Sequence, residues 1–353
     1  MRQESNAPLA PLTTLGLGGP AARLVEVSDA DETVDAVRAA DAAGEPLLVL
    51  AGGSNVVIDD AGFDGTVVRL RSAGFATDRR GDQIEVTVEA GQNWDEVVAA
   101  TVAAGLAGIE CLSGIPGAAG ATPIQNVGAY GQEVAETITA ATVYDRASGE
   151  VLTLGPDEFG FAYRHSAFKG SDRRIVLSVA FRLIPSRSSR PLRYGELTRV
   201  LGVAAGDRAP LGDVRDAVLA LRRGKGMVLD PDDTDTRSVG SFFTNPVLSG
   251  DEWTALLSRV AARLGADAAP PQWDEGDGRV KTSAAWLIER AGFVKGYGRD
   301  GVAISSKHTL ALTNRGTGTT KTLLELAREI RDGVADAFGV RLVNEPVLIA
   351  ATL

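Results

Sequence analysis

The feature that most constrains the fold of this chain is a long glycine-rich stretch at residues 113–131, SGIPGAAGATPIQNVGAYG. It contains five glycines and two prolines and carries no charged side chain. Glycine permits tight turns and lets backbone N–H groups approach a ligand closely, and successive N–H groups in such a loop form an anion-binding concavity. The stretch therefore indicates backbone held close to a large flat group, and a phosphate-bearing cofactor is the natural candidate.

A second glycine turn, AGGSN at residues 51–55, directly follows the apolar run at 47–50. Glycine turns at the end of a strand are common sites for nucleotide phosphates. Neither loop is a G-x-G-x-x-G fingerprint, and neither ends in the Lys-Ser/Thr of a Walker loop. Each alone is also explained by a simple turn, but the two together favour a cofactor site.

The composition excludes several other classes of site. The net charge of −10 argues against a nucleic-acid partner, which requires clustered Lys and Arg. Cys111 is the single cysteine, so a disulfide within the chain and thiolate metal sites are excluded, and its apolar neighbours predict a buried structural thiol. Only His165 and His308 are available for histidine chemistry, which disfavours a metal site and a Ser-His-Asp triad. No apolar run of about 18 residues and no apolar signal core is present, which predicts a cytoplasmic protein.

Local patterns predict an α+β architecture of several small lobes. Asp29 and Glu32 form an expected capping box, and Gly44 is the expected stop of the first helix. Helices are predicted at 29–44, 93–104, 213–223, 253–264, 284–291 and 319–338. Strands are predicted at 47–50, 66–70, 84–88, 138–144, 151–154, 175–184, 302–304, 310–313 and 347–350, with an acidic turn at 230–237 and a loop at 268–279.

Three further motifs occur in order along the chain: YRHSAFK at 163–169, GSFFTNP at 240–246 and NEP at 344–346. The two glycine loops resemble those of the FAD-binding fold shared by vanillyl-alcohol-oxidase-type flavoproteins. The whole series resembles the UDP-N-acetylenolpyruvoylglucosamine reductases, from about Thr13 to the C-terminus. Residues 194–197, YGEL, resemble the tyrosine-bearing substrate loop of the type I enzymes.

The resemblance implies an α+β fold with a two-lobed FAD-binding domain of the vanillyl-alcohol-oxidase type and a smaller α+β substrate-binding domain. The expected borders are 1–70 for the first lobe, with 340–353 packing back on it, 71–224 for the second lobe, and 225–339 for the UDP-sugar domain. The implied reaction is the reduction of UDP-N-acetylglucosamine enolpyruvate to UDP-N-acetylmuramate, for peptidoglycan synthesis. Hydride passes from NADPH, the co-substrate, to a non-covalently bound FAD and then to the enolpyruvyl carbon. We expect a monomer.

The resemblance also implies three catalytic residues. Ser241 is the expected proton donor to the substrate α-carbon, although a serine that caps a turn would look the same. Arg164 is expected to bind the substrate carboxylate and stabilise the charge that builds there. Glu345 is either protonated, shielded, or used to orient Arg164 or a water, and the sequence leaves these alternatives open. A surface ion pair is the ordinary alternative for both.

Further residues are expected to bind the cofactor and the substrate. The expected substrate contacts are Tyr194, Lys225 and Asn245, with Lys225 meeting the diphosphate as a point charge unless it is merely solvated. The expected cofactor contacts are Gly52, Gly53, Ser54, Asn55, Gly117, Gly120, Ile124, Gln125, Asn126, Gly128, Ala129 and Tyr130.

Two other functions compete with this hypothesis. One is an alcohol oxidase of the same FAD fold, in which the flavin is often tethered to His or Cys. Acid precipitation distinguishes it, because a non-covalent flavin is released into the supernatant. The other is a non-catalytic protein that binds nucleotide sugars, which would show no flavin absorbance.

Overall fold

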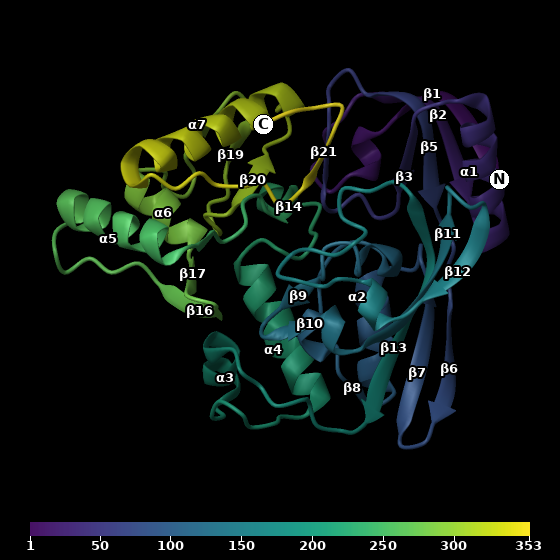
Figure 1. The fold of residues 1–353 in the computed structure, drawn as a ribbon, viewed down its shortest axis with the longest axis horizontal. Helices are drawn as coiled ribbons and strands as arrows, with labels where there is room; N and C mark the ends of the chain where they lie inside the picture. The colour runs from purple at the N-terminus through teal and green to yellow at the C-terminus, as the bar shows by residue number, and fades with distance from the viewer. The chain divides into compact units, whose positions relative to one another are not determined.

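The computed structural model describes residues 1–353 and has a mixed α+β fold, which confirms the predicted fold class (Figure 1). The chain divides into two compact units. The first unit holds Met1–Pro8, Pro20–Gly53 and Phe63–Val228, and the second holds Leu9–Gly19, Ser54–Gly62 and Leu229–Leu353. The three-part division expected from the sequence stays a prediction. None of the helices is long and apolar enough to cross a membrane.

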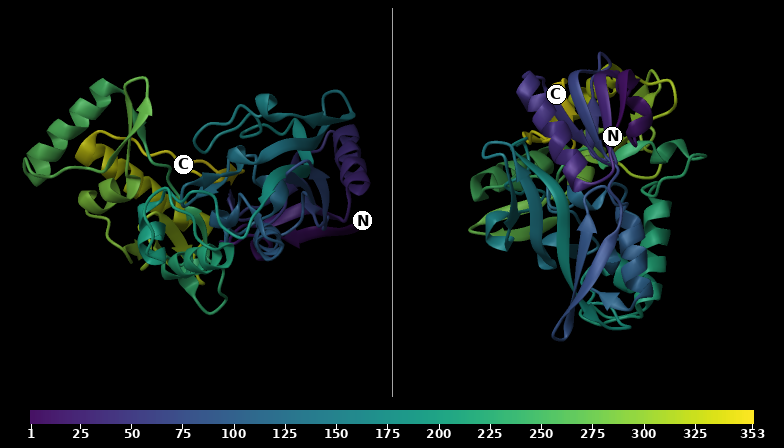
Figure 2. Two further views of the ribbon diagram at one scale, coloured as in Figure 1. Left: turned by 90° about the horizontal axis from the view of Figure 1, so that it is seen from below. Right: turned by 90° about the vertical axis from the view of Figure 1, so that its right-hand side faces the viewer.

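The first unit begins with a four-stranded sheet in the order β1-β2-β5-β3. Its strands are β1 (Arg2–Pro8), β2 (Pro20–Val27), β3 (Leu47–Leu50) and β5 (Phe63–Leu70). β2, β5 and β3 run parallel, and β1 is antiparallel to β2. α1 (Ala30–Ala43) connects β2 to β3 and packs against this sheet (Figure 2), as a crossover between parallel strands requires.

Local capping sets both ends of α1. The Asp29 side chain accepts a hydrogen bond from Glu32 N at 2.8 Å, and Gly44 takes the left-handed conformation with a φ of 66°. The Glu32 carboxylate accepts from Ser28 N instead of returning to Asp29 N. The predicted helix is therefore confirmed. Of the two hydrogen bonds of the predicted capping box, only the one from Glu32 N to the Asp29 side chain is present.

The second sheet of this unit is antiparallel in the order β12-β11-β13-β7-β6, and β8 pairs with the end of β13. The strands are β6 (Phe75–Arg80), β7 (Gln83–Glu89), β8 (Leu106–Ala107), β11 (Ile138–Asp145), β12 (Glu150–Leu154) and β13 (Arg174–Pro185). Val86, Val88 and Phe181 are buried on one face. Trp94 of α2 (Trp94–Ala103) packs on Phe181, with ring centroids 5.4 Å apart.

Two further helices, α3 (Gly195–Leu201) and α4 (Leu211–Gly224), complete the first unit. Cys111 is buried among Leu197, Val214 and Val218 of these helices. Burial raises the pKa of the Cys111 thiol far above its usual range. The prediction of a buried structural thiol is confirmed.

The second unit is built on the sheet β14-β20-β19-β18. Its elements are β14 (Ser238–Ser241), β18 (Gly298–Arg299), β19 (Val302–Ile304), β20 (Ala311–Asn314), α5 (Gly250–Leu264), α6 (Ala284–Ala291) and α7 (Thr320–Phe338). The predicted apolar face of α7 is buried, including Leu323, Ile330 and Val334. β21 (Val347–Ile349) pairs in parallel with β4 (Val56–Ile58), and both strands belong to the second unit.

A small sheet of β15 (Val247–Leu248), β17 (Arg279–Thr282) and β16 (Gln272–Gly276) also belongs to the second unit. The predicted loop at 268–279 is wrong over its second half, which β16 and the start of β17 occupy. β16 is polar and mostly exposed. It has no alternating apolar pattern, so only its pairing with β17 makes it a strand.

Candidate active site

The two glycine-rich loops predicted from the sequence meet in the first unit. A Cβ atom added to Gly52 would lie 2.6 Å from Gly117 Cα, and one added to Gly120 would lie 2.5 Å from Ala90 Cβ. Real Cβ atoms essentially never come so close to other atoms, so only glycine lets these segments pack together. Gly52 and Gly120 are therefore required by packing within the chain, whatever else they contact.

Backbone donors are available at the first loop. The N–H groups of Gly52 and Gly53 are not among the donors to the chain's own carbonyl groups, and Gly53 has a φ of 59°. Adjacent N–H groups of this kind suit an anion. The predicted loop crosses the border between the units, because Ser54 and Asn55 belong to the second unit. There the Asn55 carbonyl accepts a hydrogen bond from Val347 N at 2.9 Å.

A buried cation lies at the start of the long loop. Arg222 on α4 is 8% exposed, its Nη2 donates to Met227 O at 2.8 Å, and its Nε has no hydrogen-bond partner. Its stem borders Gly114, where an added Cβ would lie 3.4 Å from Arg222 Cδ. Burial lowers the pKa of Arg222 to about 10. The nearby Asp95 is paired with Arg215 at 2.6 Å.

Buried charges are costly unless an opposite charge compensates them, so Arg222 marks a place for an anionic group beside the loop. Lys225 was the residue predicted from this basic run, and Arg222 was missed. A usable signal was present, because Val214, Val218 and Arg222 follow one another at helical spacing, which puts a charge on an apolar stripe.

The long loop ends in a two-residue hairpin between β9 (Gly128–Ala129) and β10 (Gln132–Glu133). The turn residues Tyr130 and Gly131 have φ values of 49° and 83°, as a type I′ turn requires. The left-handed conformation costs a tyrosine roughly 1–2 kcal/mol. Strain of this kind collects at functional sites, which supports the predicted site role of Tyr130.

Tyr130 also brings the predicted cofactor and substrate residues together. Its ring meets the Tyr194 ring edge to face at 5.3 Å, and Lys225 Nζ lies 5.7 Å from its centroid. Lys225 in turn forms an ion pair with Glu196 at 2.5 Å. Burial raises the pKa of the Tyr130 hydroxyl, so it is a neutral donor at physiological pH. Glu196 was not predicted as a site residue, although it lies in the YGEL motif.

The YRHSAFK motif folds against the same loop. Ser166 Oγ donates to Ile124 O at 2.7 Å. Arg164 donates through Nη1 to Asn126 O at 3.3 Å and through Nη2 to Gly128 O at 2.8 Å, and its own φ is 52°. The structure thus places the predicted catalytic arginine on the predicted cofactor loop.

Asn126 and Glu133 are hydrogen-bonded to each other beside Arg164. Asn126 is buried, and its Nδ2 donates to Glu133 Oε2 at 2.8 Å while its Oδ1 accepts from Ala135 N at 3.1 Å. Glu133 Oε1 lies 3.7 Å from Arg164 Nη1. Much of the hydrogen-bonding capacity of the Asn126 side chain is therefore used inside the protein. Glu133 was missed, and no local pattern marks it.

Ser241 and Glu345 lie on neighbouring segments of the second unit. Ser241 ends β14 and is paired with Ala311 of β20. The next residue, Phe242, donates from its N–H to Leu310 O at 2.7 Å and accepts through its carbonyl from Glu345 N at 2.9 Å. Two of the three predicted catalytic residues are thereby fixed next to one another by backbone hydrogen bonds.

Gly240 and Asn245, on either side of Ser241, each have a structural role. Gly240 has a φ of 74°, and an added Cβ would meet no atom within 4 Å. Its backbone conformation, not crowding by the protein, therefore requires glycine. Asn245 Oδ1 accepts from Ala284 N at 3.0 Å at the start of α6, which leaves its amide nitrogen for a ligand.

Comparisons with known proteins account for nearly the whole chain. Residues 21–155 match the family described as FAD binding domain, and residues 230–349 match UDP-N-acetylenolpyruvoylglucosamine reductase, C-terminal domain. The chain is 60% identical to the UDP-N-acetylenolpyruvoylglucosamine reductase of Thermobifida fusca (strain YX), over 99% of this chain and 98% of the relative. It is 59% identical to that of Streptomyces coelicolor, over 99% and 90%. The crystal structure of the corresponding reductase from Thermus caldophilus is 25% identical, with a TM-score of 0.66 over 99% of this chain and 98% of that one.

Proposed function

Because this chain belongs to the UDP-N-acetylenolpyruvoylglucosamine reductases, flavoprotein oxidoreductases of peptidoglycan synthesis, we propose a division of its reaction among named residues. The substrate is UDP-N-acetylglucosamine enolpyruvate, the product is UDP-N-acetylmuramate, and NADPH is the reductant. The observation that carries the proposal is the hydrogen bond from Glu345 N to the carbonyl of Phe242, the residue that follows Ser241. Product analysis tests it: with NADPH, the enolpyruvyl substrate should gain two hydrogens, whereas UDP-N-acetylglucosamine should be returned unchanged.

The residues of the first unit fit an FAD. The N–H groups of Gly52 and Gly53 and the loop from Gly117 to Tyr130 would hold it, with the charge of Arg222 compensated by one of its anionic groups. Bound FAD supplies the hydride relay between NADPH and the substrate. The Cys111 thiol is buried at 1% exposure in an apolar cluster, which supports a non-covalent flavin. We further propose a cytoplasmic monomer, in line with the single cysteine.

Ser241 donates the proton that completes the reduction. Hydride addition to the terminal carbon of an enolpyruvyl ether leaves negative charge at the α-carbon, spread into the carboxylate. An alcohol is a weak acid in water, but such an enolate is a strong base, so transfer from Ser241 Oγ is favourable. The serine then recovers its proton from solvent. General acid catalysis of this kind contributes roughly 10²- to 10⁴-fold.

Arg164 stabilises the carboxylate as that charge builds. The guanidinium has five N–H donors in a rigid fork, and two of its nitrogens are anchored to the carbonyls of Asn126 and Gly128. The anchoring fixes the plane of the fork in advance, which is how preorganised charge lowers a barrier. Glu345 either acts as a neutral acid or orients Arg164, and Glu345→Gln separates these roles.

Tyr194, Lys225 and Asn245 are proposed to hold the UDP-sugar. The Lys225 ammonium lies over the Tyr130 ring, which in turn contacts Tyr194. A lysine charge at this place suits a diphosphate. The amide nitrogen of Asn245 remains available as a donor because its oxygen caps α6.

Gly53→Val is expected to release the flavin without unfolding the protein. A φ of 59° is unfavourable for valine, so the substitution should distort the loop that carries these N–H groups. The Kd for FAD should rise about tenfold, as a loss of ~1.4 kcal/mol implies, so the flavin-to-protein ratio of the purified protein should fall while far-UV circular dichroism is retained. Gly155→Val is the matched control, because an added Cβ there meets nothing within 4 Å. Full flavin occupancy in Gly53→Val would remove this loop from the cofactor site.

Tyr194→Phe is expected to weaken substrate binding more than chemistry. It keeps the ring contact with Tyr130 but removes the hydroxyl, and a lost neutral hydrogen bond raises KM about 2- to 13-fold. Tyr144→Phe is the control, since that hydroxyl accepts from Arg38 Nε at 3.3 Å on β11. An unchanged KM with a collapsed kcat would instead place Tyr194 among the catalytic residues.

A further inference from the structure

The strand that carries Ser241 is interrupted next to that residue. β14 is paired with β20 only at Ser238 with Thr313 and at Ser241 with Ala311, and the register shifts between these pairs. Gly240, with its φ of 74°, lies in the interruption. A ladder broken in this way does not by itself fix the direction of the next side chain. The ladder holds the backbone of Ser241 only through its pairing with Ala311, so contacts outside β14 that position β20 and its turn also position the serine.

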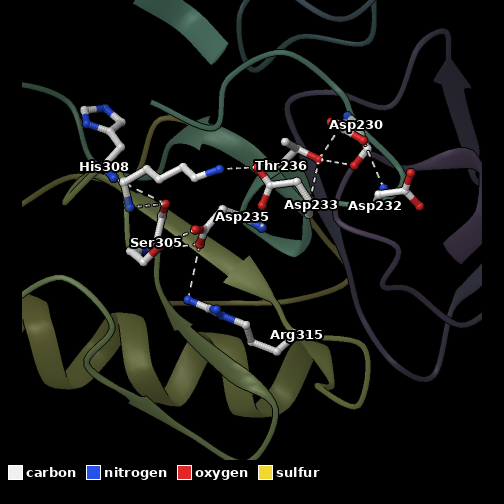
Figure 3. A network of polar contacts seen from close by, with 10 residues as sticks. Asp230, Asp232, Asp233, Asp235, Thr236, Ser305, His308 and Arg315 are labelled. Atoms are coloured by element: carbon white, nitrogen blue, oxygen red, sulfur yellow. Dashed lines mark hydrogen bonds and ion pairs between the residues drawn. The ribbon is translucent and has the colours of Figure 1, made fainter. Parts of the chain in front are cut away.

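Asp235 provides such a contact. It lies in the short 3-10 turn Thr234–Thr236 that leads into β14, and its side chain is 6% exposed. Its carboxylate accepts hydrogen bonds from Ser306 N at 3.0 Å and from Ser306 Oγ. It also accepts from Arg315 Nη2 at 3.2 Å, and Figure 3 marks this contact between Asp235 and Arg315 with a dashed line. Burial alone would raise the pKa of Asp235, but the Ser306 hydrogen bonds and the Arg315 charge hold it below its ordinary value. The group is therefore ionised at neutral pH.

The partners of Asp235 stand at both ends of β20. Ser306 belongs to the turn from β19 to β20, and Arg315 directly follows β20. The same turn ends at Leu310, whose carbonyl accepts from Phe242 N at 2.7 Å. One buried carboxylate thus holds together the segment before Ser241 and the hairpin that pairs with it.

Of the neighbouring acidic residues, only Asp233 also contacts the β19–β20 turn, at its more exposed side. Asp230 and Asp232 are hydrogen-bonded within their own loop, and Asp233 pairs with Lys307 at 2.5 Å. No group of three or more His, Cys, Asp or Glu side chains in the chain is placed to hold a metal ion. The connection between the two segments therefore consists of hydrogen bonds and ion pairs, and Asp235 is its most buried acid.

We propose that Asp235 is a positioning residue for Ser241: it fixes the β19–β20 turn against β14 so that the serine faces the substrate α-carbon. The proposal rests on the proposed role of Ser241 as proton donor. In this proposal Asp235 acts through its contacts with Ser306 and Arg315 and not on the substrate directly.

Asp235→Asn tests the proposal, because it keeps the shape of the side chain and removes its charge. Reoxidation of the reduced enzyme by the enolpyruvyl substrate should slow roughly 10- to 100-fold, the range that small misplacements of reacting groups produce. Flavin bleaching by NADPH should stay at the wild-type rate, and KM for the substrate should change by less than about threefold. Asp232→Asn is the matched control, since it removes the same charge from the same loop at an exposed position. Slowing of both half-reactions, or a change in KM alone, would overturn the proposal.

The double variant with Ser241→Ala is decisive. If Asp235 acts through Ser241, the double variant should be no slower than Ser241→Ala, whereas independent effects multiply. The proposal would be overturned if the losses of reoxidation rate in the two single variants multiplied in the double variant. It would also be overturned if Ser241→Ala slowed reoxidation while Asp235→Asn left it at the wild-type rate. A normal rate in Ser241→Ala itself would show instead that the proposed function of the serine has failed. If Asp235→Asn does not fold, Ser306→Ala takes its place, because it removes one hydrogen-bond donor to Asp235 and keeps the carboxylate charge. Ser306→Ala should slow reoxidation by the substrate in the wild-type background and should cause no further slowing in the Ser241→Ala background.

Discussion

Ser241→Ala should separate the two half-reactions of the enzyme. Reoxidation by the enolpyruvyl substrate is expected to slow by at least ~10²-fold, the contribution of a positioned general acid. Bleaching by NADPH is expected to keep a near-normal rate, because the serine serves only the substrate α-carbon. Stopped-flow absorbance of the flavin measures both rates in the same preparation.

Two further variants sharpen this test. Ser241→Cys restores a proton donor, with an ordinary pKa of about 8.5, and should recover part of the lost rate. Ser258→Ala, on the exposed surface of α5, removes a hydroxyl bonded only to Thr254 O and should change neither rate. Equal slowing of both half-reactions in Ser241→Ala would mean that the serine shapes the flavin site and donates no proton.

Arg164→Lys should be costly although the charge is kept. Lysine cannot bond the carbonyls of Asn126 and Gly128 and still offer a planar fork to a carboxylate. The fork matters most as the substrate carboxylate gains charge, so kcat should fall more than substrate affinity. Arg146→Lys is the matched control, because Arg146 forks onto Asp41 away from the loops. Near-wild-type substrate reduction in Arg164→Lys would remove the electrostatic role proposed for this residue.

Glu345→Gln is the companion variant in the same assay. If Glu345 works as a neutral acid, glutamine imitates its shape and partial activity survives. If its charge orients Arg164, glutamine loses nearly all activity, and the double variant with Arg164→Lys is no worse than either single one. Additive losses would show that the two residues act separately.

Elements with complete local signals were predicted from the sequence. α1 and α7 carry capping residues, apolar spacing and a terminal glycine, and both lie where predicted. β1 was missed because it is an exposed edge strand whose only partner, β2, lies further along the chain. β16 was missed for the same reason, since strand pairing is a non-local property.

The candidate site shows the same limit. The glycine loops were identified from local composition and the YRHSAFK motif from its resemblance to a known family, and the structure brings them together in the first unit. Glu133, Arg222 and Asp235 were missed because burial and distant partners give them their importance. Asp235 is bonded to Ser306 and Arg315, far along the chain, and nothing local distinguishes it from the other aspartates of its loop.

The half-reaction spectrum of the purified protein tests the central claim most directly. Under anaerobic conditions the protein should be yellow, lose its flavin absorbance on addition of one equivalent of NADPH, and regain it when the enolpyruvyl substrate is added. UDP-N-acetylglucosamine should not restore the colour. A protein without flavin, or a bleached protein that only oxygen reoxidises, would contradict the account.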